Sequence, residues 1–471
     1  MTSRYLMGTA IGLAMIAGQV TAQDMQTYVV STTADAGAGS LRAALTAATE
    51  ADAPTRILVA VEGDITIASG LIYEGTSALE IAGLGNLIHS EENVTLLAVP
   101  NGADLAITGL SFRGPSGFSV ENRGDLDGPA GKGIAIGVPT DATGDIMLTL
   151  TDVTVADVAG HGVHVSDCSL ADDCGGGSGG GGDGSAAGLD ITLTNVVIDN
   201  VGHGRFDADG FRADERGPGS IRFTATGSQF LGVGADGVEL DEGDAGDIHA
   251  TILHSTFAEN GNYCDPAIFN AFMPAEPEAE YDDNQTAEDA IPGPVTTSPD
   301  NTCIERAVDL YDSGFVEAYE FAIDLDDGID LDEAGEGSIY SVMFASDISN
   351  NLDEGVDWDE EGPGGIDATY VATAANFNTD DGYKMSEEDA GDVTGMVDAA
   401  SAAANGGKGF VFEEADGGDL TVAVNAALTA KNDDSDDTGI EVVQEDDGAG
   451  ALMVTASDID DGVDADGVEV K

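Results

Sequence analysis

The residue types best suited to acid–base chemistry gather in one part of this chain. Five of the six histidines lie between positions 161 and 254, and six of the ten arginines lie between positions 113 and 222. A histidine or carboxyl group transfers protons when it is held against a reacting atom, and an arginine stabilises negative charge that develops there. Carboxylates, a histidine and an arginine on one face are suited to polysaccharide chemistry. The fold decides whether these side chains meet.

A repeat of glycines predicts which of them become neighbours. We use Gly162, Gly210 and Gly237 as reference positions and call them anchor glycines. The residue one before and the residue two after each of these glycines is a histidine or a charged residue, in three successive segments of the chain. These six residues are His161, His164, Asp209, Arg212, Asp236 and Glu239. If the segments stack in register, the six side chains form one outward strip. For an enzyme, we expect His161, Asp209, Arg212 and Asp236 to be the catalytic residues.

Carboxylates recur in the same register, one residue before the anchor and four and five residues after it. We expect these positions to face outward and to hold a metal. The expected ligands are Asp236, Asp241, Glu242, Asp327, Asp332, Glu333, Glu354, Asp359 and Glu360. Unit charges one coil apart repel by about 1 kcal/mol in water, which raises carboxylate pKa values or attracts divalent cations. Calcium is the natural candidate because it takes several oxygen ligands in flexible geometry. A solvated acidic surface without a specific site is the alternative.

The element that must position these residues is a repeat of about 27 residues. Its anchors are Gly210, Gly237, Gly328, Gly355, Gly382, Gly409, Gly439 and Gly467. Apolar residues one and three after the anchor alternate with polar ones, and further strands begin near plus eleven and plus twenty. Three short strands per coil predict an all-β fold, a single parallel β-helix. A leucine-rich repeat is the alternative, but its leucine-asparagine consensus is absent.

Asparagine repeats with the same period, 23 residues after five of the anchors. The column consists of Asn260, Asn351, Asn378, Asn405 and Asn432. Identical residues stack from coil to coil in such a solenoid, about 4.8 Å apart. We therefore expect the asparagine side chains to hydrogen-bond along the solenoid axis.

The N-terminal part predicts a cap for the solenoid. Ser40 is placed as an N-cap, and the following helix presents one apolar face, which consists of Leu41, Ala44, Leu45 and Ala48. Residues 33–44, Thr-Ala-Asp-Ala-Gly-Ala-Gly-Ser-Leu-Arg-Ala-Ala, resemble the cap of exported right-handed parallel β-helix proteins of the pectate-lyase-like superfamily. The resemblance implies a right-handed solenoid. We expect a strand and helix cap over 23–70 and the β-helix over 71–471.

Two enzyme families resemble parts of the strip. Gly160-His161-Gly162 and Gly202-His203-Gly204 are similar to the Gly-His-Gly motif of polygalacturonases. Pectate lyases use aspartate-bound calcium and an arginine base, which implies such roles for Asp209, Asp236 and Arg212. The alternative for both glycine-flanked histidines is a turn before a strand. For the arginines it is pairing with nearby carboxylates.

Two interruptions of the period coincide with the cysteines. We expect insertions near 167–187 and 265–301, each closed by a disulfide, Cys168 with Cys174 and Cys264 with Cys303. Other pairings and a metal site are the alternatives. Residues 1–22 have the positive start, short apolar run and small-residue cleavage site of a secretory signal peptide. We expect export to the periplasm, cell surface or medium.

The net charge of −74 restricts the partners. Nucleic acid is excluded as a partner because phosphate binding needs a basic patch, and no apolar run is long enough for a transmembrane helix. The leading hypothesis is a secreted, non-catalytic calcium-binding solenoid that binds glycans. The alternatives are a polysaccharide lyase or glycoside hydrolase and a halophilic structural protein without a ligand. Strand-like residues at the C-terminus predict end-to-end self-association.

Overall fold

The computed structural model describes most of the chain as stacked parallel strands. The described residues are 25–119, 129–168, 184–205, 207–261, 326–432, 438–445, 448–460 and 462–471, together with three short strands between 279 and 319. The strands form a 12-stranded sheet, a 24-stranded sheet and a small three-stranded sheet. The predicted all-β fold, a right-handed parallel β-helix with one helix, is confirmed.

Each coil contributes one strand to the 12-stranded sheet. Its strands are β4 (Leu71–Ile72), β6 (Leu97–Val99), β8 (Ile134–Gly137), β11 (Val163–Ser166), β14 (Phe211–Glu215), β17 (Val238–Glu242), β23 (Ile329–Ala334), β26 (Val356–Gly362), β29 (Lys384–Asp389), β32 (Phe410–Glu414), β35 (Ile440–Gln444) and β38 (Val463–Asp466). This sheet carries the candidate site.

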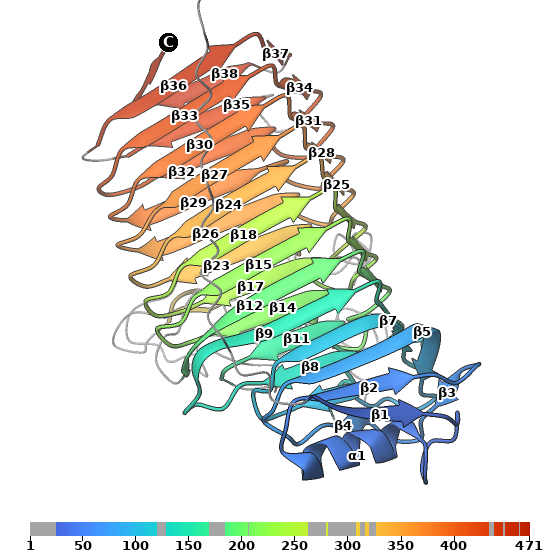
Figure 1. Cartoon of the computed structure of the whole chain (residues 1–471). Helices are drawn as coiled ribbons and strands as arrows, with labels where there is room; N and C mark the ends of the chain where they lie inside the picture. The colour runs from blue at the N-terminus through green and yellow to red at the C-terminus, as the bar shows by residue number, and fades with distance from the viewer. Residues whose placement is uncertain are drawn as a thin grey trace, which may run out of the picture.

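The 24-stranded sheet combines two columns of strands. The first column is β1 (Gln26–Val30), β2 (Thr55–Val59), β5 (Leu79–His89), β7 (Leu105–Arg113), β9 (Thr143–Thr151), β12 (Ala186–Thr194), β15 (Ile221–Thr226), β18 (Ile248–Leu253), β24 (Ile339–Phe344), β27 (Ile366–Val371), β30 (Val393–Asp398), β33 (Leu420–Asn425), β36 (Gly450–Thr455) and β39 (Val468–Val470). The second is β3 (Ile65–Thr66), β10 (Thr154–Ala156), β13 (Val197–Asp199), β16 (Gln229–Leu231), β19 (Thr256–Ala258), β25 (Asp347–Ser349), β28 (Ala374–Asn376), β31 (Ser401–Ala403), β34 (Leu428–Ala430) and β37 (Asp458–Ile459). Figure 1 shows the coils stacked in chain order along one axis.

The predicted strand positions are confirmed. The strands expected eleven residues after the anchors begin at the predicted residues, as β15 does at Ile221 and β24 at Ile339. Their alternate residues enter one continuous apolar cluster that runs from Val30 to Leu452. The anchor glycines are required by close packing, because a Cβ on Gly237 would lie 2.4 Å from the carbonyl oxygen of Gly328.

The helix covers the N-terminal end of the solenoid, as predicted. Helix α1 (Leu41–Ala51) begins after Ser40, whose Oγ accepts the N–H of Ala43 at 3.2 Å. The four apolar residues predicted to share a face are buried, and the helix contacts β1, β2 and β4. It lies at the opposite end of the coil stack from the C-terminus (Figure 1). A cap of this kind shields the apolar interior of the first coil.

The asparagine column forms the predicted ladder. Asn351 Nδ2 donates to Asn378 Oδ1 at 2.9 Å, and the same bond links Asn378 to Asn405 at 3.2 Å and Asn405 to Asn432 at 3.1 Å. Asn260 joins the column through its backbone N–H, which donates to Asn351 Oδ1. All five side chains are buried, and from Asn351 to Asn432 the ladder satisfies amide groups that have no access to water.

One expectation about the coils is wrong. An insertion near 265–301 alone would leave room for a further coil of about 27 residues between Gly237 and Gly328. Instead β17 pairs directly with β23, and Gly237 donates its N–H to the carbonyl of Asp327. The interruption is therefore longer than predicted. Its described strands, β20 (Ala279–Glu280), β21 (Val308–Leu310) and β22 (Val316–Tyr319), form a separate antiparallel sheet.

Candidate functional site

One row of side chains crosses the outward face of the 12-stranded sheet from coil to coil. We call these nine residues the central row. They are Ile72, Ala98, Ala135, His164, Arg212, Glu239, Asp330, Asp357 and Lys384, which are successive Cα partners in the strand pairs. The row passes from apolar residues through a histidine and an arginine to three acids and a lysine. Parallel in-register pairing of the coils produces this order.

A groove of about 990 Å³ lies over the apolar end of the central row. Arg42, Lys132 and Arg205 line it, and its described lining contains no acidic side chain. The small side chains of Ala98 and Ala135 are part of its floor. The helix cap helps to shape the groove, because Arg42 donates to the carbonyls of Ser69 and Gly70 at 2.7 Å. Three of the 15 lysines and arginines therefore line one groove of a chain that carries 89 acidic residues.

A chain of hydrogen bonds connects the groove to the middle of the row. Lys132 Nζ lies 2.6 Å from His164 Nδ1, and His164 Nε2 lies 2.7 Å from Asp214 Oδ2. Arg212 Nε donates to the other oxygen of Asp214 at 2.7 Å. Burial opposes ionisation of Asp214, but Arg212 and His164 outweigh it and hold its pKa well below the usual range. Asp214 is thus a fixed negative charge between the guanidinium of Arg212 and the imidazole of His164.

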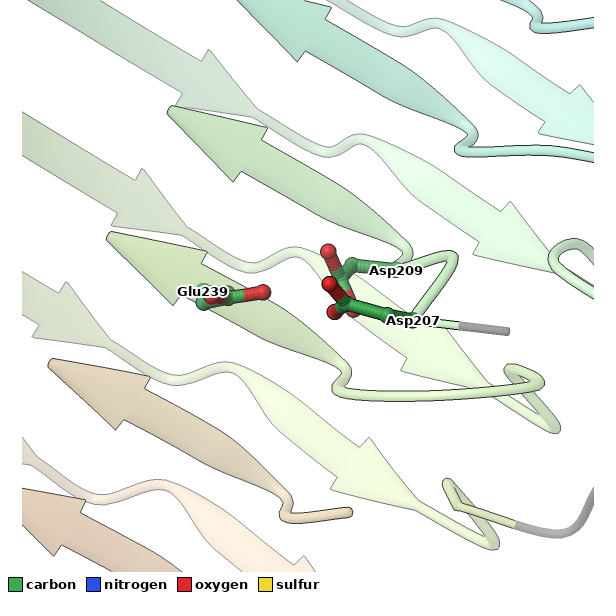
Figure 2. A group of neighbouring side chains, drawn as sticks. All are labelled: Asp207, Asp209 and Glu239. Atoms are coloured by element: carbon green, nitrogen blue, oxygen red, sulfur yellow. The ribbon is translucent and has the colours of Figure 1, made fainter. Parts of the chain in front are cut away.

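Arg212 joins carboxylates from two coils. Its Nη1 contacts Glu239 at 2.5 Å, Asp207 at 2.9 Å and Asp209 at 3.4 Å. Figure 2 shows that the carboxyl groups of Asp207 and Asp209 lie together and that Glu239 projects from the neighbouring strand. These three acids would otherwise be a possible metal site, since their oxygens lie within 4.8 Å of one another. The guanidinium of Arg212 already contacts all three carboxyl groups.

The structure brings the four predicted catalytic residues into one strip. His161 Nδ1 accepts the backbone N–H of Asp209 at 2.9 Å, and Asp209 Oδ1 accepts the backbone N–H of Asp236 at 3.1 Å. Burial, then Lys132, His164 and Arg212, lower the pKa of His161 well below its usual value, so its ring is neutral at pH 7. Burial, then Asp207, raise the pKa of Asp209 to about 7. The catalytic roles of these residues stay predictions.

Arg212 is not suited to the role of a base. The carboxylates around it, Glu239 foremost, overcome the effect of burial and raise its pKa well above the usual value. A guanidinium in such surroundings keeps its proton at any pH at which the fold persists. Its contacts instead indicate a residue that neutralises and positions acids.

The acidic part of the central row lies between Arg212 and Lys384. Lys384 Nζ contacts Asp357 at 2.7 Å and both Glu354 and Asp359 at 3.8 Å, while Asp241 pairs with Arg216. The coil between these cations carries Asp327, Asp330 and Asp332, and no ion pair reaches these three among the described residues. Burial, then neighbouring acids, raise the pKa of all three well above the usual value.

Among the described residues, two groups of acids from these coils have oxygens within 4.8 Å of one another and could hold a metal. They are Glu239 with Asp330 and Asp332, and Asp327 with Asp353 and Glu354. Of the expected ligands, Asp327, Asp332 and Glu354 belong to these groups. Asp236 accepts the backbone N–H of Asp327.

Three of the four glutamates of the expected metal set lie on the other face of the sheet. Glu242, Glu333 and Glu360 are successive Cα partners, and each is buried on the side that carries the core residues of its strand. The fifth position after the anchor shares the parity of the first and third, so it points inward. These residues form an internal ladder with Glu215, Glu387, Glu414 and Gln444.

Other sequence predictions fall outside the described residues. Cys174, Cys264 and Cys303 and the expected signal peptide over 1–22 are among these, so the disulfide pairings and export stay predictions. Within the described part of the chain, no helix combines the length and apolar character needed to span a membrane.

Sequence reasoning missed the residue that joins the groove to the row. Lys132 stands between Gly131 and Gly133, as His161 stands between Gly160 and Gly162, and the strands that follow pair in register. The repeated Gly-X-Gly pattern was the available signal. Asp330 and Asp357 were missed as well, although they occupy the same place after their anchors as Arg212.

Comparisons with known proteins return structures and no sequence relatives. No family model and no curated protein matches the chain. Among solved structures, the A-module of mannuronan C-5 epimerase AlgE6 from Azotobacter vinelandii is 10% identical, with a TM-score of 0.40, over 94% of this chain and 99% of that one. The AlgE4 A-module from the same organism is 11% identical, with a TM-score of 0.38, over 94% and 96%. The Agl-KA catalytic domain is 12% identical, with a TM-score of 0.39, over 91% and 64%. None of these similarities establishes a family for this chain.

Proposed function

We propose that this protein binds an anionic polysaccharide in the groove lined by Arg42, Lys132 and Arg205. The observation that carries the proposal is the charge of the groove, which is opposite to that of the whole chain. A cationic groove in a repulsive surface selects both the sign of a ligand and the place where it binds. The groove is concave and partly apolar, as ligand sites are.

Replacing Arg205 with glutamine tests this function. We expect calorimetry with an oligogalacturonate to show about a tenfold loss of affinity, because one charge-assisted contact contributes roughly 1.5–3 kcal/mol. Arg222→Gln removes the same charge from the outward face of β15, away from the groove, and should leave the affinity unchanged. If the wild-type protein shows no binding of the charged oligosaccharide at low salt, the proposal is wrong.

A second function, calcium binding, is favoured by Asp327. Its side chain is only 7% exposed, and its Oδ1 is buried without a hydrogen-bond partner among the described residues. Asp353 and Glu354 complete a group of oxygens around it. Leaving a buried carboxylate oxygen without a partner is costly, and calcium would supply the missing partner with ligands of the type it prefers. The protein would then be a calcium-stabilised, glycan-binding solenoid.

Asp327→Asn tests the calcium site. We expect calcium to stabilise the wild type by about 2.7 kcal/mol at a concentration one hundred times the dissociation constant, and the variant to lose most of that gain in thermal melts. Asp347→Asn is the control, because it removes an exposed carboxylate from β25. Equal calcium effects on both variants would indicate general charge screening and no site at Asp327.

A further inference from the structure

Lys132 is the member of the groove that is joined to the buried charges of the central row. Its side chain is almost fully buried, yet it lines the groove. An ammonium group can only donate, so His164 Nδ1 must accept from it at 2.6 Å. The imidazole proton therefore lies on Nε2 and is donated to Asp214 Oδ2 at 2.7 Å. The tautomer of His164 thus determines whether Nδ1 can accept from the Lys132 ammonium group and hold its side chain in this orientation.

Asp214 fixes that tautomer and does not itself move. It accepts from Arg212 Nε at 2.7 Å on its other oxygen, and it is fully buried on β14, the strand next to His164. Cation, imidazole, carboxylate and cation thus follow one another from Lys132 to Arg212. Hydrogen-bonded side chains behind a contact residue reduce the freedom that it loses on binding.

We propose that Lys132 is the residue that recognises the anionic group of a sugar in the groove, and that His164 and Asp214 are the positioning residues that aim it. This inference rests on the proposed glycan-binding function and names its specificity determinant. The ligand class is a glycan whose sugars carry a carboxylate or a sulfate. The ammonium group of Lys132 would not increase the affinity for a neutral glycan.

The arrangement makes recognition depend on the protonation of His164. The groups that face its ring are Lys132, Asp214, His161 at a ring-centroid distance of 4.5 Å, and Arg212 on the adjacent strand. Burial lowers the pKa of His164, Lys132 and Arg212 lower it further, and Asp214 opposes them. The ring is therefore neutral at pH 7. When acid protonates Nδ1, His164 can no longer accept from Lys132, and the lysine loses the contact that positions it from this side.

The test compares three variants with calorimetry, using an oligogalacturonate, its carboxyl-reduced counterpart and a sulfated oligosaccharide of equal length. We expect Lys132→Met to weaken the charged ligands about tenfold and to leave the reduced one unchanged. His164→Leu, which removes the acceptor, should weaken them by a similar factor. His164→Asn should restore the affinity, because its Oδ1 can accept from Lys132. It should also abolish the acid-dependent loss that the wild type shows, since the amide does not titrate.

The outcomes separate this inference from the function on which it rests. If wild-type protein binds none of the charged ligands, the proposed function fails and the inference fails with it. If the wild type binds and Arg205→Gln weakens binding but Lys132→Met does not, the function stands and the role of Lys132 is wrong. If His164→Leu and His164→Asn behave alike at every pH, the positioning role of His164 is wrong. The ratio between carboxylated and sulfated ligands identifies which anion is preferred.

Discussion

Arg212→Met should destabilise the protein by about 3–5 kcal/mol at pH 8, as expected when one partner of a buried ion-pair network is removed. Arg212 is 5% exposed and contacts carboxylates of Asp207, Asp209, Asp214, Glu239 and Asp241. Without the guanidinium these acids would face one another at close range. The measurement is the free energy of unfolding of the wild type and of the variant, each obtained by denaturant unfolding at pH 8.

The pH dependence and a control identify the cause of that loss. Burial raises the pKa of both Asp209 and Asp241 to about 7 although Arg212 opposes it, so the acids take up protons on acidification and the penalty should shrink at pH 5.5. Arg222→Met is the control, because Arg222 is 48% exposed and lies 3.4 Å from Asp145. Such a surface pair contributes less than about 1 kcal/mol. Equal losses for the two arginines would show that Arg212 is not a centre of charge neutralisation.

Glu360→Gln should stabilise the protein at pH 8 by about 1–3 kcal/mol, because it removes a buried carboxyl group of the internal glutamate ladder that must take up a proton when the chain folds at this pH. Glu360 is 0% exposed, and in the ionised state no donor among the described residues reaches either of its oxygens. Burial, then Glu333, raise its pKa to about 10. The ladder itself shows that an amide fits, since Gln444 occupies its last position and donates to the carbonyl of Gly418 at 3.2 Å.

The sign of the pH dependence follows from the raised pKa. The folded protein loses stability as pH rises from the ordinary glutamate range towards about 10, because the unfolded chain releases this proton first. The advantage of Glu360→Gln should therefore disappear near pH 4.5. Glu361→Gln makes the same substitution at an exposed position on the same strand and should change stability by less than about 0.5 kcal/mol. Stabilisation by both variants at pH 8 would indicate relief of net charge alone.

The period of the sequence predicted the fold down to single residues. Strand starts such as Ile221 and Ile339, the helix after Ser40 and the Asn351–Asn378–Asn405 ladder follow from local rules that repeat. The columns of acids were predicted for the same reason. The inward direction of Glu333 was open to the same reasoning, because positions one, three and five after an anchor share one face.

The rest depended on contacts that the period does not encode. Lys132 reaches His164 across a coil boundary, and neither the length of a side chain nor its rotamer appears in the repeat. Pairing of Arg212 with Glu239 and of Lys384 with Asp357 decides which acids remain without a cation. The spacing between Gly237 and Gly328 would allow these glycines to lie in adjacent coils or to be separated by one further coil. Only the pairing of β17 with β23 shows that the coils are adjacent.

The direct pairing of β17 with β23 divides the molecule into two consecutive runs of coils that meet at a single junction. In a solenoid each coil touches only its neighbours, so the energy that couples the two runs comes from this one interface. Closing a long excursion of the chain costs little more entropy than closing a short one. Strands pair across this junction in all three columns, so each run can nucleate by itself during synthesis and then dock on the other.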